Sequence, residues 1–117
     1  MSDVQVPSDP EDVKIIGLAR ATRARTGASE GACVRDTDGR TYAAATVENA
    51  DPSLTTSALR GAVSAAASSG IRTFEAAAVV TEGLVSVADL AALREFGVGL
   101  PVLVAGPDGV VRETLST

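Results

Sequence analysis

Hydrophobic residues recur along the chain with the period of a helix in some segments and as continuous apolar runs in others. In the first such segment Val13, Ile16 and Ala19 follow one another at intervals of three residues, with other apolar side chains beside them. This spacing places them on one face of a helix. The segment begins with Asp9 as a cap residue and Pro10 at the first helical position, and a glycine follows its last arginines. We therefore predict a helix over residues 9–26.

Two further helices are predicted later in the chain. Residues 55–69 carry alanine, leucine and valine at helical spacing, and Gly70 is a stop signal. Residues 86–96 begin with a serine that can cap a helix and end before Gly97. The high alanine content of the first of these helices allows it to pack closely against a neighbouring element.

The runs between the helices predict five strands. Residues 31–35 and 40–47 are small or β-branched, and the Asp38-Gly39 pair between them is typical of a hairpin turn. The nearly continuous apolar run at 74–81 predicts a central strand buried on both faces. Two further strands are expected at 101–105 and 110–114, on either side of a Gly-Pro-Asp-Gly turn.

The predicted order is helix, strand, strand, helix, strand, helix, strand, strand. It indicates an α/β fold with a five-stranded mixed sheet flanked by helices. A length of 117 residues suits one domain. We expect residues 1–8, which are short, polar and proline-containing, to be a flexible leader and residues 9–117 to be a single domain.

Composition narrows the function classes. Hydrophobic residues make up 45% of the chain but aromatic residues only 3%, so the core must consist mainly of small aliphatic side chains. The net charge is −5 and the basic residues are scattered, which disfavours a nucleic-acid partner. The sequence has neither an apolar run long enough to span a membrane nor a secretory signal, so we expect no membrane partner and a cytoplasmic location.

Metal-binding side chains are scarce. Cys33 is the single cysteine, so no internal disulfide can form, and there is no histidine. Cys33 lies within a predicted strand, and we interpret it as a small buried hydrophobe rather than a reactive thiol.

Three stretches resemble a known family. They are Asp38-Gly-Arg-Thr-Tyr42 with Val47-Glu-Asn-Ala50; Ser57-Ala-Leu-Arg60; and Leu93-Arg-Glu-Phe-Gly97 with Leu100-Pro-Val-Leu103 and Pro107-Asp-Gly109. In this order they are similar to the small, homotetrameric, zinc-dependent cytidine deaminases, over nearly the whole chain after residue 12. The resemblance implies the three-layer cytidine deaminase-like fold, in which helices cover both faces of the sheet.

The resemblance fails at the residues that carry the family's chemistry. In the cytidine deaminase family, cysteines at two helix N-termini hold a zinc ion that activates water, and a glutamate moves protons. By position Ser57 replaces the first zinc cysteine, Leu59 the glutamate, and Ser86 and Asp89 the other two cysteines. We therefore expect no catalytic residues, no metal site and no cofactor. Serine is a good helix cap, so we hypothesise that Ser57 and Ser86 cap the helices that zinc would otherwise tie together.

The nucleoside-binding positions are partly kept. Carried over from the family, Glu48 matches a glutamate that holds the ribose, Thr46 stands where the family has asparagine, and Ala28 where it has an aromatic residue. Arg60 matches an arginine near the zinc site and the subunit contacts. The candidate ligand-binding residues are therefore Glu48, Thr46 and Arg60. Two alternatives stay open: Glu48 is a solvated or capping acid, and Arg60 is an ordinary surface arginine.

Three functions are considered. The first is a non-catalytic cytidine deaminase-like protein with a scaffold or regulatory role, a homo-oligomer (dimer or tetramer) or a subunit mixed with an active relative. The second is a sensor that binds a pyrimidine nucleoside. The third is a hydrolase with a rebuilt metal site, for which acids such as Glu30 or Glu82 would have to converge.

Overall fold

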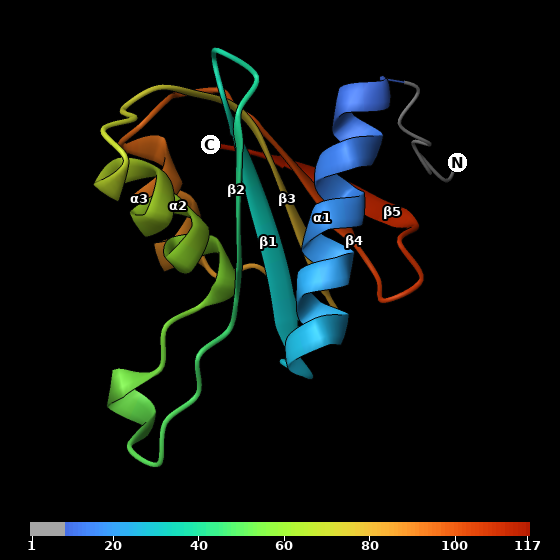
Figure 1. Cartoon of the computed structure of the whole chain (residues 1–117), viewed down its shortest axis with the longest axis vertical. Coiled ribbons are helices and arrows are strands. Elements are labelled where there is room, and N and C mark those ends of the chain that lie inside the picture. Colours follow the sequence, from blue (N-terminus) through green and yellow to red (C-terminus); the bar gives the residue numbers. More distant parts are fainter. Residues whose placement is uncertain (1–8) are drawn as a thin grey trace.

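The computed structural model describes residues 9–117, arranged as a five-stranded sheet with helices on both faces (Figure 1). Helix α1 covers one face, and α2 and α3 cover the other. The elements in chain order are α1 (Pro10–Thr26), β1 (Glu30–Asp36), β2 (Thr41–Ala45), the short 3-10 helix η1 (Pro52–Leu54), α2 (Ala58–Ser68), β3 (Phe74–Thr81), α3 (Val87–Arg94), β4 (Pro101–Ala105) and β5 (Val111–Ser116). The predicted α/β class, three layers and element order are confirmed. The leader expected at residues 1–8 lies outside the described residues.

The sheet has the strand order β2-β1-β3-β4-β5 and is mixed, as predicted. Strand β1 pairs antiparallel with both β2 and β3, and β4 pairs antiparallel with β5. Strands β3 and β4 are parallel, which requires a crossover connection, and α3 supplies it. Strand β3 therefore lies in the centre of the sheet, and its side chains are buried except for that of Glu75.

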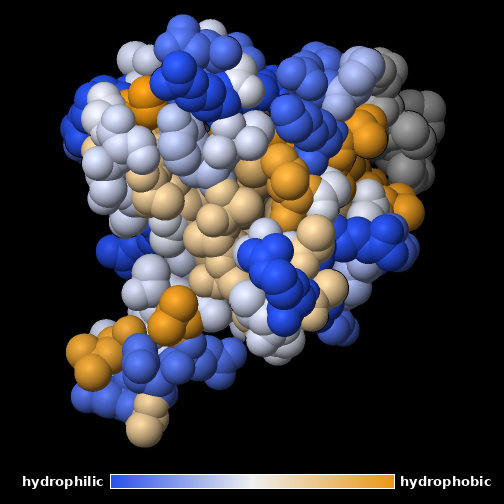
Figure 2. Space-filling model, in the orientation of Figure 1, coloured by the Kyte–Doolittle hydropathy of each residue, from blue (hydrophilic) through white to orange (hydrophobic). Residues whose placement is uncertain are grey.

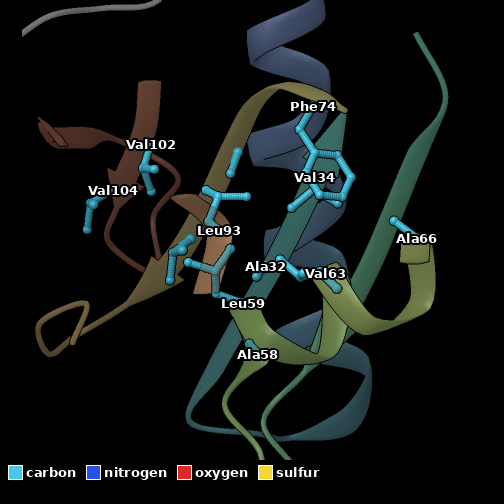
Figure 3. Packing of buried hydrophobic residues seen from close by; sticks show 13 residues of the cluster. Ala32, Val34, Ala58, Leu59, Val63, Ala66, Phe74, Leu93, Val102 and Val104 are labelled. Atoms are coloured by element: carbon cyan, nitrogen blue, oxygen red, sulfur yellow. The ribbon is translucent and has the colours of Figure 1, made fainter. Parts of the chain in front are cut away.

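Alternate residues of the strands separate two cores. Ala32 and Val34 of β1 face α2 and α3, whereas Cys33 between them faces α1. Figure 3 shows Leu59 of α2 and Leu93 of α3 in the first of these cores. The small side chains of both layers let the helices approach the sheet closely, as the alanine-rich composition predicts.

Helix α1 begins and ends as predicted, and the face that it buries differs from the predicted apolar stripe at Val13. Asp9 caps it by accepting a hydrogen bond from the Glu11 amide. Ile15, Ile16 and Ala19 are buried, but Val13 is 52% exposed, so its place in the predicted apolar stripe is wrong. Val13 and Ile15 lie about 200° apart around a helix, and the face with both isoleucines buries more apolar surface.

Several predicted boundaries differ from the observed ones, and most of the predicted elements were too long. Helix α2 begins at Ala58 rather than residue 55, because Thr56 forms an isolated antiparallel bridge with Val47. For the same reason β2 ends at Ala45 instead of residue 47. Helix α3 ends at Arg94, two residues before the predicted end, while β5 continues to Ser116. No helix within residues 9–117 is long and apolar enough to cross a membrane.

Residues 46–56, here called the arm, project away from the sheet between β2 and α2. The arm is the green extension in Figure 1 and a separate lobe in the space-filling view of Figure 2. Backbone hydrogen bonds between Val47 and Thr56 close its base, at N to O distances of 2.9 and 3.0 Å. Inside it the Asn49 side chain donates to the Leu54 carbonyl over 2.9 Å. These bonds hold the arm as a defined hairpin-like extension.

Candidate functional site

Two serines begin the two helices on the same face of the sheet. Ser57 precedes α2 in extended backbone conformation, and its Oγ accepts a hydrogen bond from the Arg60 amide over 3.2 Å. Ser86 precedes α3 in the same way, and its Oγ accepts from the Asp89 amide over 3.1 Å. Each hydroxyl satisfies a backbone donor that lacks a partner within the helix. The hypothesis that both serines act as helix caps is confirmed.

The N-termini of α2 and α3 meet at a hydrogen bond between side chains. The Ser57 hydroxyl donates to Asp89 Oδ1 over 2.9 Å, across 32 positions of sequence. Asp89 is only 8% exposed and lies in the first turn of α3, where the positive end of the helix dipole favours a carboxylate. The structure therefore brings together Ser57, Ser86 and Asp89, three of the four residues that the resemblance assigns to the family's catalytic positions.

Leu59, the fourth of these residues, belongs to the core. It is 1% exposed and packs in the cluster that contains Val79 and Leu93 (Figure 3). An aliphatic side chain can neither donate nor accept a proton. Leu59 thus contributes apolar packing at the position where the resemblance places a proton-transferring glutamate.

The donor atoms at the meeting point of the helices do not suit zinc. Zinc in proteins is bound by thiolate, imidazole or carboxylate, and structural sites have four such ligands. Here two neutral hydroxyls accompany one carboxylate, and both hydroxyls already accept hydrogen bonds as caps. In residues 9–117 no group of three or more histidine, cysteine, aspartate or glutamate side chains could hold a metal ion. The residues present therefore do not fit the family's zinc ion.

The acids considered for a rebuilt metal site have partners elsewhere. Glu30 on β1 accepts a hydrogen bond from the Thr81 hydroxyl over 3.0 Å. Glu82 forms an ion pair with Arg23 of α1 at 3.2 Å. Each of these contacts ties neighbouring elements together, and neither involves Asp89.

The three candidate ligand-binding residues occupy different settings. Glu48 is exposed on the arm, and Arg60 is exposed in the first turn of α2. Thr46 is half-buried at the start of the arm, where its hydroxyl lies 3.5 Å from Glu30 Oε1 and its amide donates to the Glu30 carbonyl. Ala28, at the position of the family's aromatic residue, is half-buried in the turn before β1.

Buried charges on β1 were missed in the sequence. Arg35 is buried between Asp12 of α1 and Glu75 of β3, with nitrogen to oxygen distances of 3.0 and 2.6 Å. Burial acts to lower the pKa of Arg35, but the hydrogen bonds to Glu75 and Asp12 outweigh it and raise the pKa. The available signal in the sequence was a charged residue, Arg35, at the end of a predicted strand of small and apolar residues. These contacts hold α1 against the sheet, so we assign Arg35 a structural role.

Cys33 is buried on the α1 side of the sheet, as predicted. Burial raises the pKa of its thiol from 9.0 to about 11, although a hydrogen bond with the Tyr42 backbone and nearby positive charges act to lower it. The nucleophilic form of cysteine is the thiolate, so this thiol is unreactive at neutral pH.

Comparison with solved structures finds the same fold in cytidine deaminases. The chain superposes on cytidine deaminase from Burkholderia pseudomallei with a TM-score of 0.77 and 30% identity, covering 88% of this chain and 90% of that one. For the enzyme from Mycobacterium leprae the TM-score is 0.73 at 22% identity, with coverages of 92% and 94%. The one from Bacillus anthracis gives 0.66 at 11% identity, with coverages of 93% and 83%. The latter two likenesses show the fold alone.

A family model gives the same assignment. None of the curated proteins matches the chain significantly. The model described as cytidine deaminase-like, however, matches residues 8–109, which is most of the chain. This match agrees with the sheet order, with the two capped helices that meet at Ser57 and Asp89, and with the Burkholderia structure. The chain therefore belongs to the cytidine deaminase-like proteins.

Proposed function

We propose that this protein is a non-catalytic member of the cytidine deaminase-like family, in which residues 9–117 act as one domain and serve as an oligomeric scaffold or regulatory subunit. One observation carries the loss of catalysis. The Ser57 hydroxyl and the Asp89 carboxylate, at two of the positions that the resemblance assigns to zinc cysteines, are hydrogen-bonded to each other at 2.9 Å. A direct bond between these side chains performs the structural part of the metal's task, joining two helix ends.

The chemistry of the remaining residues supports the same proposal. Deamination in the family needs an activated water and a carboxylate that moves protons. Asp89 is a lone carboxylate that accepts from Ser57, and Leu59 is buried among aliphatic side chains. Within residues 9–117, the meeting point of α2 and α3 thus holds neither a ligand set for the ion that would activate water nor a proton carrier beside it.

The oligomeric part of the proposal rests on the resemblance and on surface composition. The resemblance implies subunit contacts through helices, and α2 keeps an alanine- and serine-rich sequence that permits close packing. A chain with this fold and no catalytic centre can still occupy a subunit position, either beside identical copies or beside an active relative. Scaffolding or regulation is the role that such a subunit performs.

The test is a deamination assay on the purified protein, with and without added zinc, beside an active cytidine deaminase as the positive control. We expect no ammonia release from cytidine above that of buffer. Protein purified without chelator should contain less than about a tenth of an equivalent of zinc. Sustained turnover of cytidine, or one bound zinc per chain, would overturn the proposal.

A thermal-shift titration tests the alternative of a nucleoside sensor. A ligand at 100 times its dissociation constant stabilises the folded protein by about 2.7 kcal/mol. We expect cytidine and uridine to leave the melting temperature unchanged. A saturable rise that is lost in Glu48→Gln would instead assign the protein to pyrimidine nucleoside binding.

A further inference from the structure

Three arginines lie at the end of the sheet where the parallel strands β3 and β4 finish. Arg20 and Arg23 stand three residues apart on one side of α1, and Arg112 lies near the start of β5. These three side chains are here called the arginine cluster. Figure 1 shows the last turns of α1 at the same end of the molecule as the turn between β4 and β5. In open α/β sheets, ligands bind beyond the carboxyl ends of the strands.

Backbone carbonyls hold each side chain of the arginine cluster in place. Arg20 and Arg23 donate through Nε to carbonyl oxygens at 2.8 and 3.1 Å, those of Pro107 and Ser29 respectively. Arg112 donates to the carbonyls of the two residues that follow β3. A carbonyl is neutral, so these bonds orient the guanidinium groups without cancelling their charge. Each guanidinium has five N–H donors, and the bonds to carbonyls use only one or two of them.

One carboxylate, that of Glu82, accompanies the arginine cluster. Glu82 Oε1 accepts from Arg23 over 3.2 Å, and the backbone carbonyl of Glu82 accepts from Arg112 over 3.5 Å. One residue therefore contacts arginines from both α1 and β5. The side chain of Glu82 is 76% exposed, whereas that of Arg23 is 23% exposed. An ion pair with so exposed a carboxylate is weak, so a more highly charged anion can replace it.

The other acids near the arginine cluster are directed elsewhere. Glu30 accepts from the Thr81 hydroxyl over 3.0 Å. Asp108 accepts from the amide of Val110, within the turn after β4, over 2.9 Å. The register partner of Glu113 on β4 belongs to the core beneath α2 and α3, so Glu113 projects from that face and not towards α1. In a chain of net charge −5, three oriented cations thus meet one weakly held anion among residues 9–117.

We propose that the arginine cluster binds a small phosphate-bearing ligand, on the opposite face of the sheet from the helix ends that meet at Ser57 and Asp89. A guanidinium group donates two parallel hydrogen bonds to a phosphate, which makes arginine well suited to this recognition. The unused donors of three such groups favour a ligand with several phosphoryl oxygens, of which diphosphate is the simplest. The ligand takes the place of the Glu82 carboxylate beside Arg23. This inference does not depend on the proposed function.

The test is isothermal titration calorimetry of the full chain with inorganic diphosphate, at fixed pH and ionic strength, with chloride as the control anion. We expect saturable binding of about one diphosphate per chain. Arg23→Gln and Arg112→Gln each remove charged hydrogen bonds and should weaken binding about fivefold or more. Arg25→Gln is the matched control, because Arg25 is exposed on the opposite side of α1 from Arg23. It removes the same charge and should bind like the wild type.

Glu82→Gln gives a prediction of the opposite sign. It removes the carboxylate that competes with the ligand for Arg23, so diphosphate should bind about two- to fivefold more tightly. A side chain with only a structural role would not produce this gain. Circular dichroism shows whether each variant is folded.

Three outcomes would overturn the inference. The first is no saturable binding by the wild type at millimolar diphosphate. The second is an equal loss of affinity in the Arg23, Arg112 and Arg25 variants, which would show attraction to overall charge and no defined site. The third is tighter binding of a short oligonucleotide than of diphosphate, which would assign the arginine cluster to a nucleic-acid backbone. The deamination assay judges the loss of catalysis independently of all three.

Discussion

The hydroxyl of Ser57 donates a hydrogen bond to Oδ1 of Asp89 over 2.9 Å and so joins the first turns of α2 and α3. Ser57 also caps its own helix through the Arg60 amide. One serine therefore satisfies a helix end and a mostly buried carboxylate at the same time. This hydrogen-bonded pair stands where the resemblance places a metal centre, and we expect it to stabilise this face of the molecule.

A double-mutant cycle measures the strength of this pair. Hydrogen bonds to charged groups contribute about 1.5–3 kcal/mol, so Ser57→Ala and Asp89→Ala should show a coupling free energy in that range. The measurement is urea unfolding of the wild type, the two single variants and the double variant. Strictly additive losses would show that the contact contributes nothing to stability.

Ser86→Ala removes a cap without breaking a contact between helices. Loss of a serine cap typically costs about 1 kcal/mol. Ser57→Ala should cost more, because it removes a cap and also leaves Asp89 without its hydroxyl donor. Chemical denaturation of the two variants under one set of conditions compares them, and an equal loss would argue against the second role of Ser57.

Substituting cysteines at the starts of α2 and α3 should create a zinc site. The triple variant Ser57→Cys, Ser86→Cys, Asp89→Cys places three thiols at the meeting point of α2 and α3, and thiolates are favoured zinc ligands. We expect about one zinc per chain by elemental analysis, and a rise in melting temperature on zinc addition. Wild type treated identically is the control. A triple variant that is folded but retains no zinc would show that the helix ends are not placed as the family requires.

Arg35 should contribute more to stability than any exposed arginine. Its side chain is 9% exposed and donates to both Asp12 and Glu75. Replacement by methionine keeps much of the volume but removes both charged hydrogen bonds, and we expect a loss of about 2–3 kcal/mol. Arg25→Met is the control, because Arg25 is exposed and surface substitutions usually change stability by less than about 0.5 kcal/mol. Equal losses in urea unfolding would contradict the structural role of Arg35.

Asp36 should make stability depend on pH in the acid range. Burial acts to raise the pKa of Asp36, but hydrogen bonds from the Arg40 and Asp38 amides and the Tyr42 hydroxyl outweigh it and hold the pKa below 3.8. The unfolded state therefore binds the proton more tightly than the folded state. The stabilisation is fully present well above 3.8 and is lost as pH falls through the folded pKa.

The comparison with Asp36→Asn isolates this effect. The variant cannot titrate at this position, so its melting temperature should fall less steeply than that of the wild type when the pH is lowered below about 4. Thermal unfolding at a series of pH values gives both slopes. Identical slopes would show that Asp36 has the same pKa in the folded and unfolded states.

The order of helices and strands could be predicted because its signals are local. The cap and proline at Asp9 and Pro10, and the apolar run of β3, each act within a few residues. The boundaries that failed depend on contacts across the chain. The bridge between Val47 and Thr56 ends β2 early and delays α2, and no local propensity encodes it.

The candidate site, like the fold, was predictable from the sequence only in its local features. From the sequence, the resemblance predicted that Ser57, Leu59, Ser86 and Asp89 stand at the family's catalytic positions, and the lack of zinc deaminase chemistry there stays a prediction. The sequence also predicted that the serines would cap helices, because a cap is bonded to an amide three residues away.

Only the tertiary structure decided that the Ser57 hydroxyl meets the Asp89 carboxylate, that Arg35 is buried between two acids, and that the arm stands apart with Val47 and Leu54 exposed. The physical reason is the range of the interactions. Hydrophobic period and capping act over one or two turns of chain, whereas these contacts arise when the sheet and both helix layers bring distant segments within about 3–4 Å.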